Sequence, residues 1–175
     1  MPIHRTTSTL LALTLLAATG GALAQINASS AAAEPETTRT DADFWRLVVS
    51  PYTFHYSQDP DHEAVYAIGL ERQRSDKWYY GATYFSNSFG QPSGYVYFGQ
   101  RYGDLFSVEP LFVQWSVGVL YGYKYPYEDK VPFNVNGWSP GAVLSVGWQF
   151  TREFSSQLNF LGTAALQIQL SIDFR

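Results

Sequence analysis

The chain has 175 residues, which is enough for one sheet-based domain behind a leader but not for two domains. It is 46% hydrophobic and 17% aromatic but only 15% charged, which indicates contact with something other than water, and a mean hydropathy of -0.15 excludes a bundle of membrane-spanning helices. The balance of 11 basic and 15 acidic residues argues against nucleic-acid binding, and the absence of cysteine excludes disulfides, thiolate catalysis and cysteine-ligated metals.

Residues 1–24 are typical of a cleaved secretory signal peptide. Arg5 precedes an apolar run from Leu10 to Ala18, and the small-residue cleavage site Ala22-Leu23-Ala24 follows. The apolar run is too short to span a bilayer, so we expect cleavage and not a membrane anchor. Residues 25–43 contain almost no large apolar side chain and are expected to form a flexible lead-in to a folded domain at 44–175.

Alternation between apolar and small or polar residues is the main pattern of the rest of the chain. It is clear in 66–71, 111–123 and 142–150, and most regular near the end, where Leu166, Ile168, Leu170, Ile172 and Phe174 alternate with polar residues. Counting every such segment predicts eight strands, at 45–54, 64–74, 77–86, 93–102, 110–124, 139–150, 154–161 and 164–175.

The connections between these segments indicate a membrane barrel. Short breaks at 75–76, 103–104, 151–153 and Gly162 contrast with longer connections at 55–63, 87–92 and 125–138. The sequence therefore predicts an all-β protein, an eight-stranded antiparallel transmembrane β-barrel, in the outer membrane of a Gram-negative bacterium. We expect a monomer with no cofactor and no metal. Eight strands leave room inside for side chains or one slender ligand, so a wide channel is not expected.

A soluble lipocalin-like barrel or β-sandwich is the alternative, and it would turn the apolar face inward. Two features favour the membrane barrel: the small and polar face carries glycines that suit a narrow lumen, and tryptophans and tyrosines near strand ends suit aromatic girdles. One feature departs from it, because such barrels commonly finish on an aromatic residue and here Arg175 follows Phe174.

Candidate catalytic residues lie in two outer connections. A hydroxyl nucleophile needs a base, and the base needs an orienting partner. His55 and Ser88 lie just beyond neighbouring strand ends and could meet, with Asn87 beside Ser88, or one of the acids near His55, orienting the imidazole; those acids are Asp59, Asp61 and Glu63. The alternative is that His55 and Ser88 are ordinary solvated loop residues.

These elements resemble the lipid A palmitoyltransferase (PagP) family, over most of 44–175. The family's Trp-His segment is similar to Phe54-His55, its Phe-Lys-Asp-Ser to Phe85-Ser86-Asn87-Ser88, and its proline-bearing loop to 131–133 and 139–141. The resemblance implies transfer of an acyl chain from phospholipid to lipid A, with His55 as general base, Ser88 attacking or binding the oxyanion, and Asn87 donating to oxyanion or ring. It also implies sideways lipid entry at strand-edge prolines, here Pro92, Pro132 and Pro140.

Three departures from the family pattern are visible. Asn87 stands where the family has Asp, so the resemblance implies that Asn87→Asp raises the rate. The family's amphipathic helix before the first strand has no clear counterpart, and its apolar chain-length ruler cannot be mapped.

Two other functions remain open. The segment Phe85-Ser86-Asn87 followed by Gln91-Pro92 is also similar to the His-x-Ser-Asn segment of lipid A deacylases, although Tyr84 replaces the family's His and the motif lies far from the C-terminus. A non-catalytic small barrel, acting as a solute conduit, an adaptor or a structural protein, is the other alternative.

Overall fold

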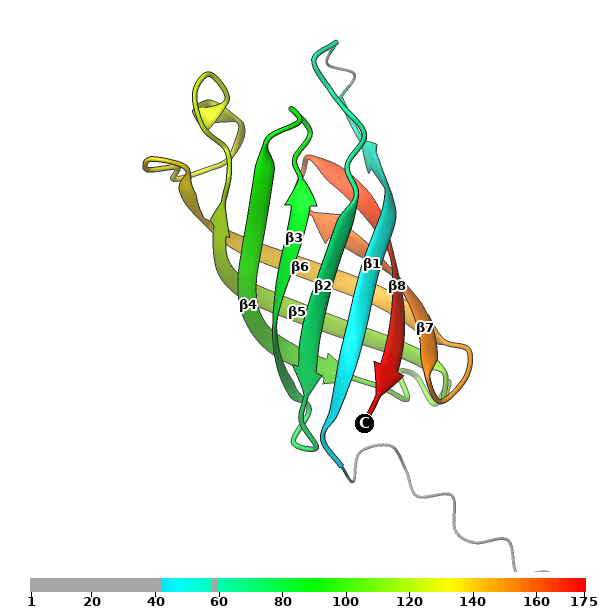
Figure 1. Cartoon of the computed structure of the whole chain (residues 1–175). Helices are drawn as coiled ribbons and strands as arrows, with labels where there is room; N and C mark the ends of the chain where they lie inside the picture. The colour runs from blue at the N-terminus through cyan, green and yellow to red at the C-terminus, as the bar shows by residue number, and fades with distance from the viewer. Residues whose placement is uncertain (1–41, 58–59) are drawn as a thin grey trace, which may run out of the picture. The chain divides into compact units, whose positions relative to one another are not determined.

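The computed structural model describes residues 42–57 and 60–175, so the predicted signal peptide and nearly all of the predicted lead-in lie outside the described residues. Within them the chain forms a closed antiparallel barrel in which each strand pairs with its sequence neighbours and β8 pairs with β1 (Figure 1). The strands are β1 (Phe44–His55), β2 (Ala67–Gln73), β3 (Trp78–Ser86), β4 (Pro92–Tyr102), β5 (Leu111–Tyr121), β6 (Trp138–Gln149), β7 (Phe154–Leu161) and β8 (Ala165–Phe174). The predicted all-β barrel of eight antiparallel strands is confirmed.

The strand ends agree with the predicted segments to within one residue, except at two places. The segment predicted to begin at 64 enters the ladder only at Ala67, and the one predicted to end at 124 stops at Tyr121. At the second place Gly122 has a φ of +142°, which takes the backbone out of strand geometry. At the start of β2, the cause lies in β1. A bulge shifts the register of β1 between Val49 and Tyr52, and the pairing of β1 with β2 ends there.

Polar residues face the inside of this barrel and apolar residues face outward. In β8, Gln169 and Ser171 are buried in the lumen, whereas Ile168 and Leu170 are 39% and 36% exposed on the outer wall. The same order holds in β5, where Gln114 and Ser116 are buried and Val117 and Val119 are exposed. The outward direction expected for Leu166, Ile168 and Leu170 is therefore confirmed.

Buried ion pairs fill the lumen toward the end that holds the start of β1 and the end of β8. Arg46 Nε donates to Asp173 Oδ1 at 2.7 Å, and Arg46 Nη1 donates to Glu71 Oε2 at 3.2 Å. Tyr97 donates its hydroxyl hydrogen to Glu71 Oε1 at 2.9 Å. These contacts join β1, β2, β4 and β8 across the lumen, and the side chains of Arg46 and Glu71 are only 1% and 2% exposed.

The connections divide between the two ends of the barrel (Figure 1). One end, called here the loop end, holds the β1–β2, β3–β4, β5–β6 and β7–β8 connections; the β5–β6 connection includes the 3-10 turn η2 (Glu128–Lys130). The other end holds the β2–β3, β4–β5 and β6–β7 connections. The short break predicted at 103–104 is a longer connection, 103–110, that is folded tightly because Asp104, Phe106 and Ser107 have positive φ. In the described part of the chain, no helix is long and apolar enough to cross a membrane.

Two stretches of the wall are paired on one side only. Pairing of β1 with β2 covers residues 44–50, and pairing of β6 with β7 covers residues 144–149. The remaining loop-end residues, 52–55 of β1 and 138–143 of β6, pair with β8 and with β5. Pro140 lies within residues 138–143, and Pro51 lies at the bulge that precedes residues 52–55. A residue without an N–H costs no ladder hydrogen bond where the strand edge is unpaired. Of the three prolines expected to mark strand edges, Pro140 lies in β6, Pro92 begins β4 and Pro132 lies in the β5–β6 connection.

Candidate functional site

His55 and Ser88 meet at the loop end of the barrel. His55 is the last residue of β1 and Ser88 lies in the β3–β4 connection, yet His55 Nε2 is 2.7 Å from Ser88 Oγ. The main chain of Glu63 brings the two connections together, because its N–H donates to the Ser88 carbonyl oxygen at 2.8 Å. The structure thus unites two of the three predicted catalytic residues in a base–hydroxyl pair.

Asn87, the third predicted residue, shapes the turn that presents Ser88. Asn87 is 0% exposed, and its Oδ1 accepts hydrogen bonds from the main-chain N–H groups of Phe89 at 2.9 Å and Gln91 at 3.0 Å. Its main-chain N–H donates to the Gln91 carbonyl oxygen at 2.9 Å. Within residues 42–57 and 60–175, no hydrogen bond joins the Asn87 side chain to His55. The side chain therefore closes its own connection, as an Asx turn does.

The His62 ring and the Glu63 carboxylate also lie close to the His55–Ser88 pair. The His62 ring packs on the His55 ring at 4.4 Å between centroids and on Phe89 at 5.4 Å. Glu63 places its carboxylate beside Gly90, where a Cβ atom would come within 2.6 Å of Oε2. Gly90 has a φ of +72°, so both backbone conformation and space require glycine there. Asp59, another candidate partner of His55, lies outside the described residues.

Tyr123 is a site residue that the sequence did not single out. It lies two residues after the end of β5. Its carbonyl oxygen accepts a hydrogen bond from Asn134 Nδ2 at 2.7 Å, and its ring makes an edge contact with Phe89. Burial raises the pKa of Tyr123, and a side-chain hydrogen bond with Ser88 partly opposes that rise. Ser88 therefore has an imidazole and a phenol as neighbours. Among 13 tyrosines in the chain, only the three-dimensional fold identifies this one.

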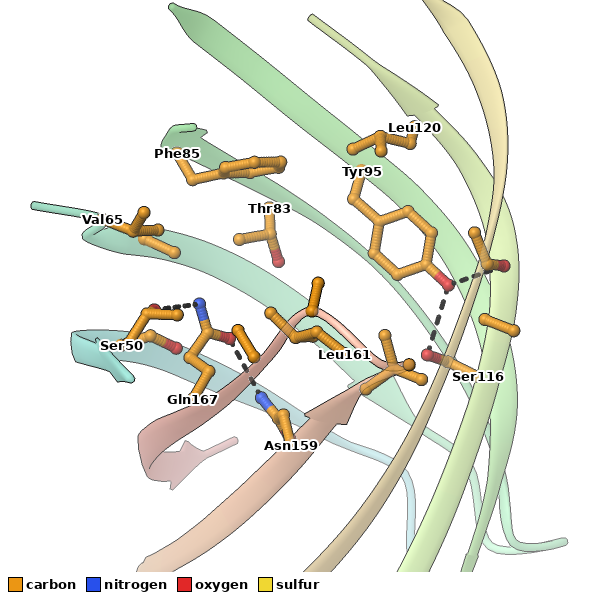
Figure 2. A pocket seen from close by; sticks show the side chains of 18 of the residues that line it. Ser50, Val65, Thr83, Phe85, Tyr95, Ser116, Leu120, Asn159, Leu161 and Gln167 are labelled. Atoms are coloured by element: carbon orange, nitrogen blue, oxygen red, sulfur yellow. Dashed lines mark hydrogen bonds between the residues drawn. The ribbon is translucent and has the colours of Figure 1, made fainter. Parts of the chain in front are cut away.

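A cavity of about 440 Å³ opens beside this cluster and extends into the lumen. His55, Ser88 and Tyr123 line it at the loop end. Figure 2 shows four apolar side chains, in or near strand ends, that also line it: Val65, Phe85, Leu120 and Leu161. Deeper in the lumen, the lining changes to hydroxyl and amide groups. The cavity is large enough for a small-molecule ligand or one hydrocarbon chain.

The chemistry offered by this arrangement is that of an activated hydroxyl. The Nε2···Oγ distance lies within the range in which a histidine accepts the proton of an attacking serine. In the described ranges, no group of three or more His, Cys, Asp or Glu side chains could hold a metal ion.

Comparison with known proteins gives no further assignment. No protein-family model matches the chain, and no curated protein matches it.

Proposed function

We propose that the protein is an outer-membrane acyltransferase that moves an acyl chain from a phospholipid to lipid A. The observation that carries the proposal is the 2.7 Å contact between His55 Nε2 and Ser88 Oγ at the mouth of a lumen cavity. A base–hydroxyl pair at the rim can act on an ester whose acyl chain lies inside the cavity. The resemblance to the lipid A palmitoyltransferase family supplies the substrates of this proposal.

The distribution of side chains on the barrel supports insertion in a bilayer. Apolar residues cover the outer wall, and strands of 10–12 residues such as β1, β5 and β8 suit the apolar band of an outer-membrane barrel. Exposed aromatic residues mark both ends: Trp45, Trp78 and Trp148 toward one, and Tyr52, Tyr84 and Trp138 toward the loop end. Two aromatic girdles around an apolar band are typical of a barrel that faces lipid.

The proposed reaction has two steps. Ser88 Oγ attacks the ester carbonyl carbon of the phospholipid while His55 Nε2 takes the hydroxyl proton; the ester C–O bond then breaks, and His55 returns the proton to the oxygen of the departing lysophospholipid. In the second step His55 takes a proton from a hydroxyl of lipid A, whose oxygen attacks the acyl-Ser88 ester. Ser88 leaves with that proton, and the acyl chain is then esterified to lipid A.

Tyr123 supplies a hydrogen-bond donor that the proposed reaction needs. The tetrahedral intermediate carries a negative oxygen, and a fixed donor beside it lowers the barrier. Burial raises the pKa of Tyr123, which favours the protonated phenol that can donate. In this proposal Tyr123, and not Asn87, is the donor next to the nucleophile.

A sideways path for the lipid is supported by the unpaired stretch of β6. An apolar groove on the outer wall there shares four lining residues with the lumen cavity: Ser116, Ala142, Val143 and Gly162. Residues 138–143 of β6 pair with β5 and not with β7, so no continuous ladder closes the wall at this point. An acyl chain in the outer leaflet could pass here without extracting the whole lipid from the bilayer.

Expression in a Gram-negative strain that lacks its own palmitoyltransferase, followed by mass spectrometry of lipid A, tests the proposal. We expect lipid A to gain the mass of one acyl chain, and both His55→Ala and Ser88→Ala to reduce transfer by about a thousandfold or more. Ser75→Ala, in the exposed β2–β3 connection, is the matched control and should leave transfer unchanged. All variants should still fold, which is shown by a gel band whose migration changes when the sample is heated.

The alternatives give other readouts in the same experiment. A lipid A deacylase uses the same base–hydroxyl pair with water as acceptor, and lipid A would lose an acyl chain. The buried Arg46–Glu71–Asp173 contacts and the polar interior favour a non-catalytic barrel as the other alternative. Folded protein with unchanged lipid A would support that barrel and would contradict the acyltransferase proposal.

A further inference from the structure

The imidazole of His55 is held by a ring contact and by one hydrogen bond. Its Nε2 atom is 2.7 Å from Ser88 Oγ, and its ring lies against the His62 ring, with 4.4 Å between centroids and 39° between planes. Within residues 42–57 and 60–175, no hydrogen bond reaches Nδ1, the atom through which a carboxylate or an amide orients the imidazole of a catalytic triad. The contact with His62 therefore takes the place of an orienting acceptor.

The His62 ring is itself fixed by a row of aromatic side chains. It makes an edge contact with Phe89 at 5.4 Å between centroids, and Phe89 stacks on Tyr127 at 4.1 Å. The main-chain N–H of Phe89 donates to Asn87 Oδ1 at 2.9 Å, so the Phe89 ring belongs to the turn that presents Ser88. The row joins the β1–β2, β3–β4 and β5–β6 connections, and packing of this kind locks the rotation of a functional side chain.

Both rings of the histidine pair can take up a proton, and they are too close to carry one each without repulsion. Imidazoles ordinarily titrate near neutral pH, and a like charge nearby disfavours the charged form. With 4.4 Å between the ring centroids, a proton on His62 opposes a proton on His55, and the two groups titrate as a coupled pair. Only neutral His55 can take the proton of Ser88, so the charge of His62 preserves the base as the pH falls.

Other titratable groups reach the pair from two of the four connections at the loop end. Asp61 and Glu63 flank His62 in the β1–β2 connection, and Tyr123, Tyr127 and Lys130 of the β5–β6 connection contact Phe89. The β3–β4 and β7–β8 connections, 87–91 and 162–164, contain no titratable side chain. A carboxylate favours the charged form of a nearby imidazole, so Asp61 and Glu63 act against His62, whereas Lys130 has the same sign of charge as protonated His62.

We propose that His62 is the positioning residue of the base: its ring holds the His55 imidazole against Ser88, and its charge keeps His55 neutral in a mildly acid medium. This inference rests on the acyl-transfer function proposed above and adds a residue that acts on the reaction through His55. His62 thereby takes the orienting role that was expected for Asn87 or for a neighbouring acid.

Two substitutions separate the ring of His62 from its charge. His62→Phe keeps an aromatic ring against His55 and removes the proton, whereas His62→Ala removes both. Transfer is measured on the folded full-length barrel in detergent micelles, with a phosphatidylethanolamine donor and lipid A as acceptor. At about pH 8.5, above the range in which imidazoles ordinarily titrate, we expect His62→Phe to stay within about twofold of the native rate. His62→Ala should lower kcat by about tenfold or more with a similar KM, because the base is no longer held against Ser88.

The pH dependence of kcat/KM tests the charge. The rate is lost as the pH falls through the titration of His55, because protonated His55 cannot act as a base. Without the opposing charge of His62, this loss should occur at higher pH in His62→Phe than in the native protein. Lys130→Met is the matched control: it removes a positive charge from the lining of the same cavity but no ring from His55, so the acid limb should stay close to its native position.

Nuclear magnetic resonance measures the same coupling without turnover. The chain has three histidines, at positions 4, 55 and 62, so each imidazole signal can be assigned by one substitution. We expect the His55 signal to titrate at lower pH in the native protein than in His62→Phe, with no substrate present. Should His62→Ala give no gel band whose migration changes on heating, the comparison of the native and His62→Phe proteins still decides.

The two measurements separate failure of this inference from failure of the proposed function. Equal or reversed titration of His55 in the native and His62→Phe proteins overturns the inference, and so does a native kcat in His62→Ala; if the native protein transfers acyl chains, the acyltransferase proposal then still stands. An equal shift of the acid limb in Lys130→Met also overturns the inference, because any nearby cation would then serve. Absence of any transfer, with His55 titrating at lower pH in the native protein, overturns the acyltransferase proposal and supports the coupling of the two imidazoles.

Discussion

Ser88 is held at the rim by contacts from two neighbouring connections at once. The Asn87 side chain closes the β3–β4 connection around it, and the Glu63 N–H bonds its carbonyl oxygen from the β1–β2 connection. Its hydroxyl contacts His55 Nε2, and Tyr123 lines the same cavity beside it. At the residue scale, the site therefore depends on side chains that shape the turn as much as on those that take part in chemistry.

Asn87→Asp distinguishes a structural from an orienting role for this residue. A carboxylate keeps both acceptor contacts to main-chain N–H groups but lies away from His55, so we expect transfer to stay within about threefold of the native rate. Asn87→Ala leaves those buried donors unsatisfied and should destabilise the barrel by about 1–3 kcal/mol. Mass spectrometry of lipid A measures the transfer rate. The stability is measured from the loss of the heat-shifted gel band as the protein unfolds. A large rise in Asn87→Asp would instead favour the role implied by the resemblance.

Tyr123→Phe tests the donor beside Ser88. Removal of a transition-state donor lowers the rate by about a hundredfold, with little change in substrate binding, so kcat should fall and KM should stay similar. Tyr66→Phe, an exposed tyrosine just before β2, is the control and should keep the native rate. Equal rates for native and Tyr123→Phe proteins would remove this residue from the mechanism.

At the scale of elements, the pairing of β6 decides how the wall can open. Its loop-end half is bonded to β5 alone, and Pro140 lies in that half. In this half of β6, one edge is hydrogen-bonded to a neighbouring strand and the other edge is not. The outer groove and the inner cavity share lining residues at this point.

Filling the groove tests sideways entry of the lipid. Ala142 is an exposed residue that lines the groove, so Ala142→Trp should obstruct the path and lower transfer by about tenfold or more. Ala82→Trp is a matched control, since Ala82 is also exposed and lies in β3, which is paired on both sides. Rates are compared by lipid A mass spectrometry on proteins with the same folded band. Similar rates for the two variants would argue that lipid enters elsewhere.

At the scale of the whole molecule, the barrel is inverted relative to a soluble one: ion pairs and amides occupy the inside, and aliphatic and aromatic residues occupy the outside. In water this arrangement exposes a continuous apolar wall, whereas in a bilayer the same wall is solvated by lipid.

Two lysine substitutions on β8 test which environment surrounds that wall. Leu170→Lys, mid-strand and outward-facing, should destabilise folding in lipid vesicles by about 2–4 kcal/mol, whereas Phe174→Lys, near the interface, should cost about 0–1 kcal/mol. Equilibrium urea unfolding in vesicles of matched thickness measures both. Equal and small effects would contradict a bilayer around this wall.

The fold could be read from the sequence because strand periodicity is local. Alternation at 166–174 assigns each residue to one of two faces, and eight such segments with turn residues between them suffice to count the strands and place their ends closely. The pairing of His55 with Ser88 was also predictable, because residues just beyond neighbouring strand ends meet at one rim. The sequence alone could not place the bulge in β1 or end its pairing with β2.

Tertiary structure decided what surrounds those two residues. The side chain of Asn87 could have formed a hydrogen bond with His55. Instead it bonds main-chain N–H groups within its own connection, and this contact sets its direction. Tyr123 becomes a neighbour of Ser88 because the β5–β6 and β3–β4 connections contact each other at the loop end, where the Phe89 ring lies against Tyr123 and Tyr127. Periodicity determines which way a side chain faces, but only closure of the barrel determines which side chains it meets.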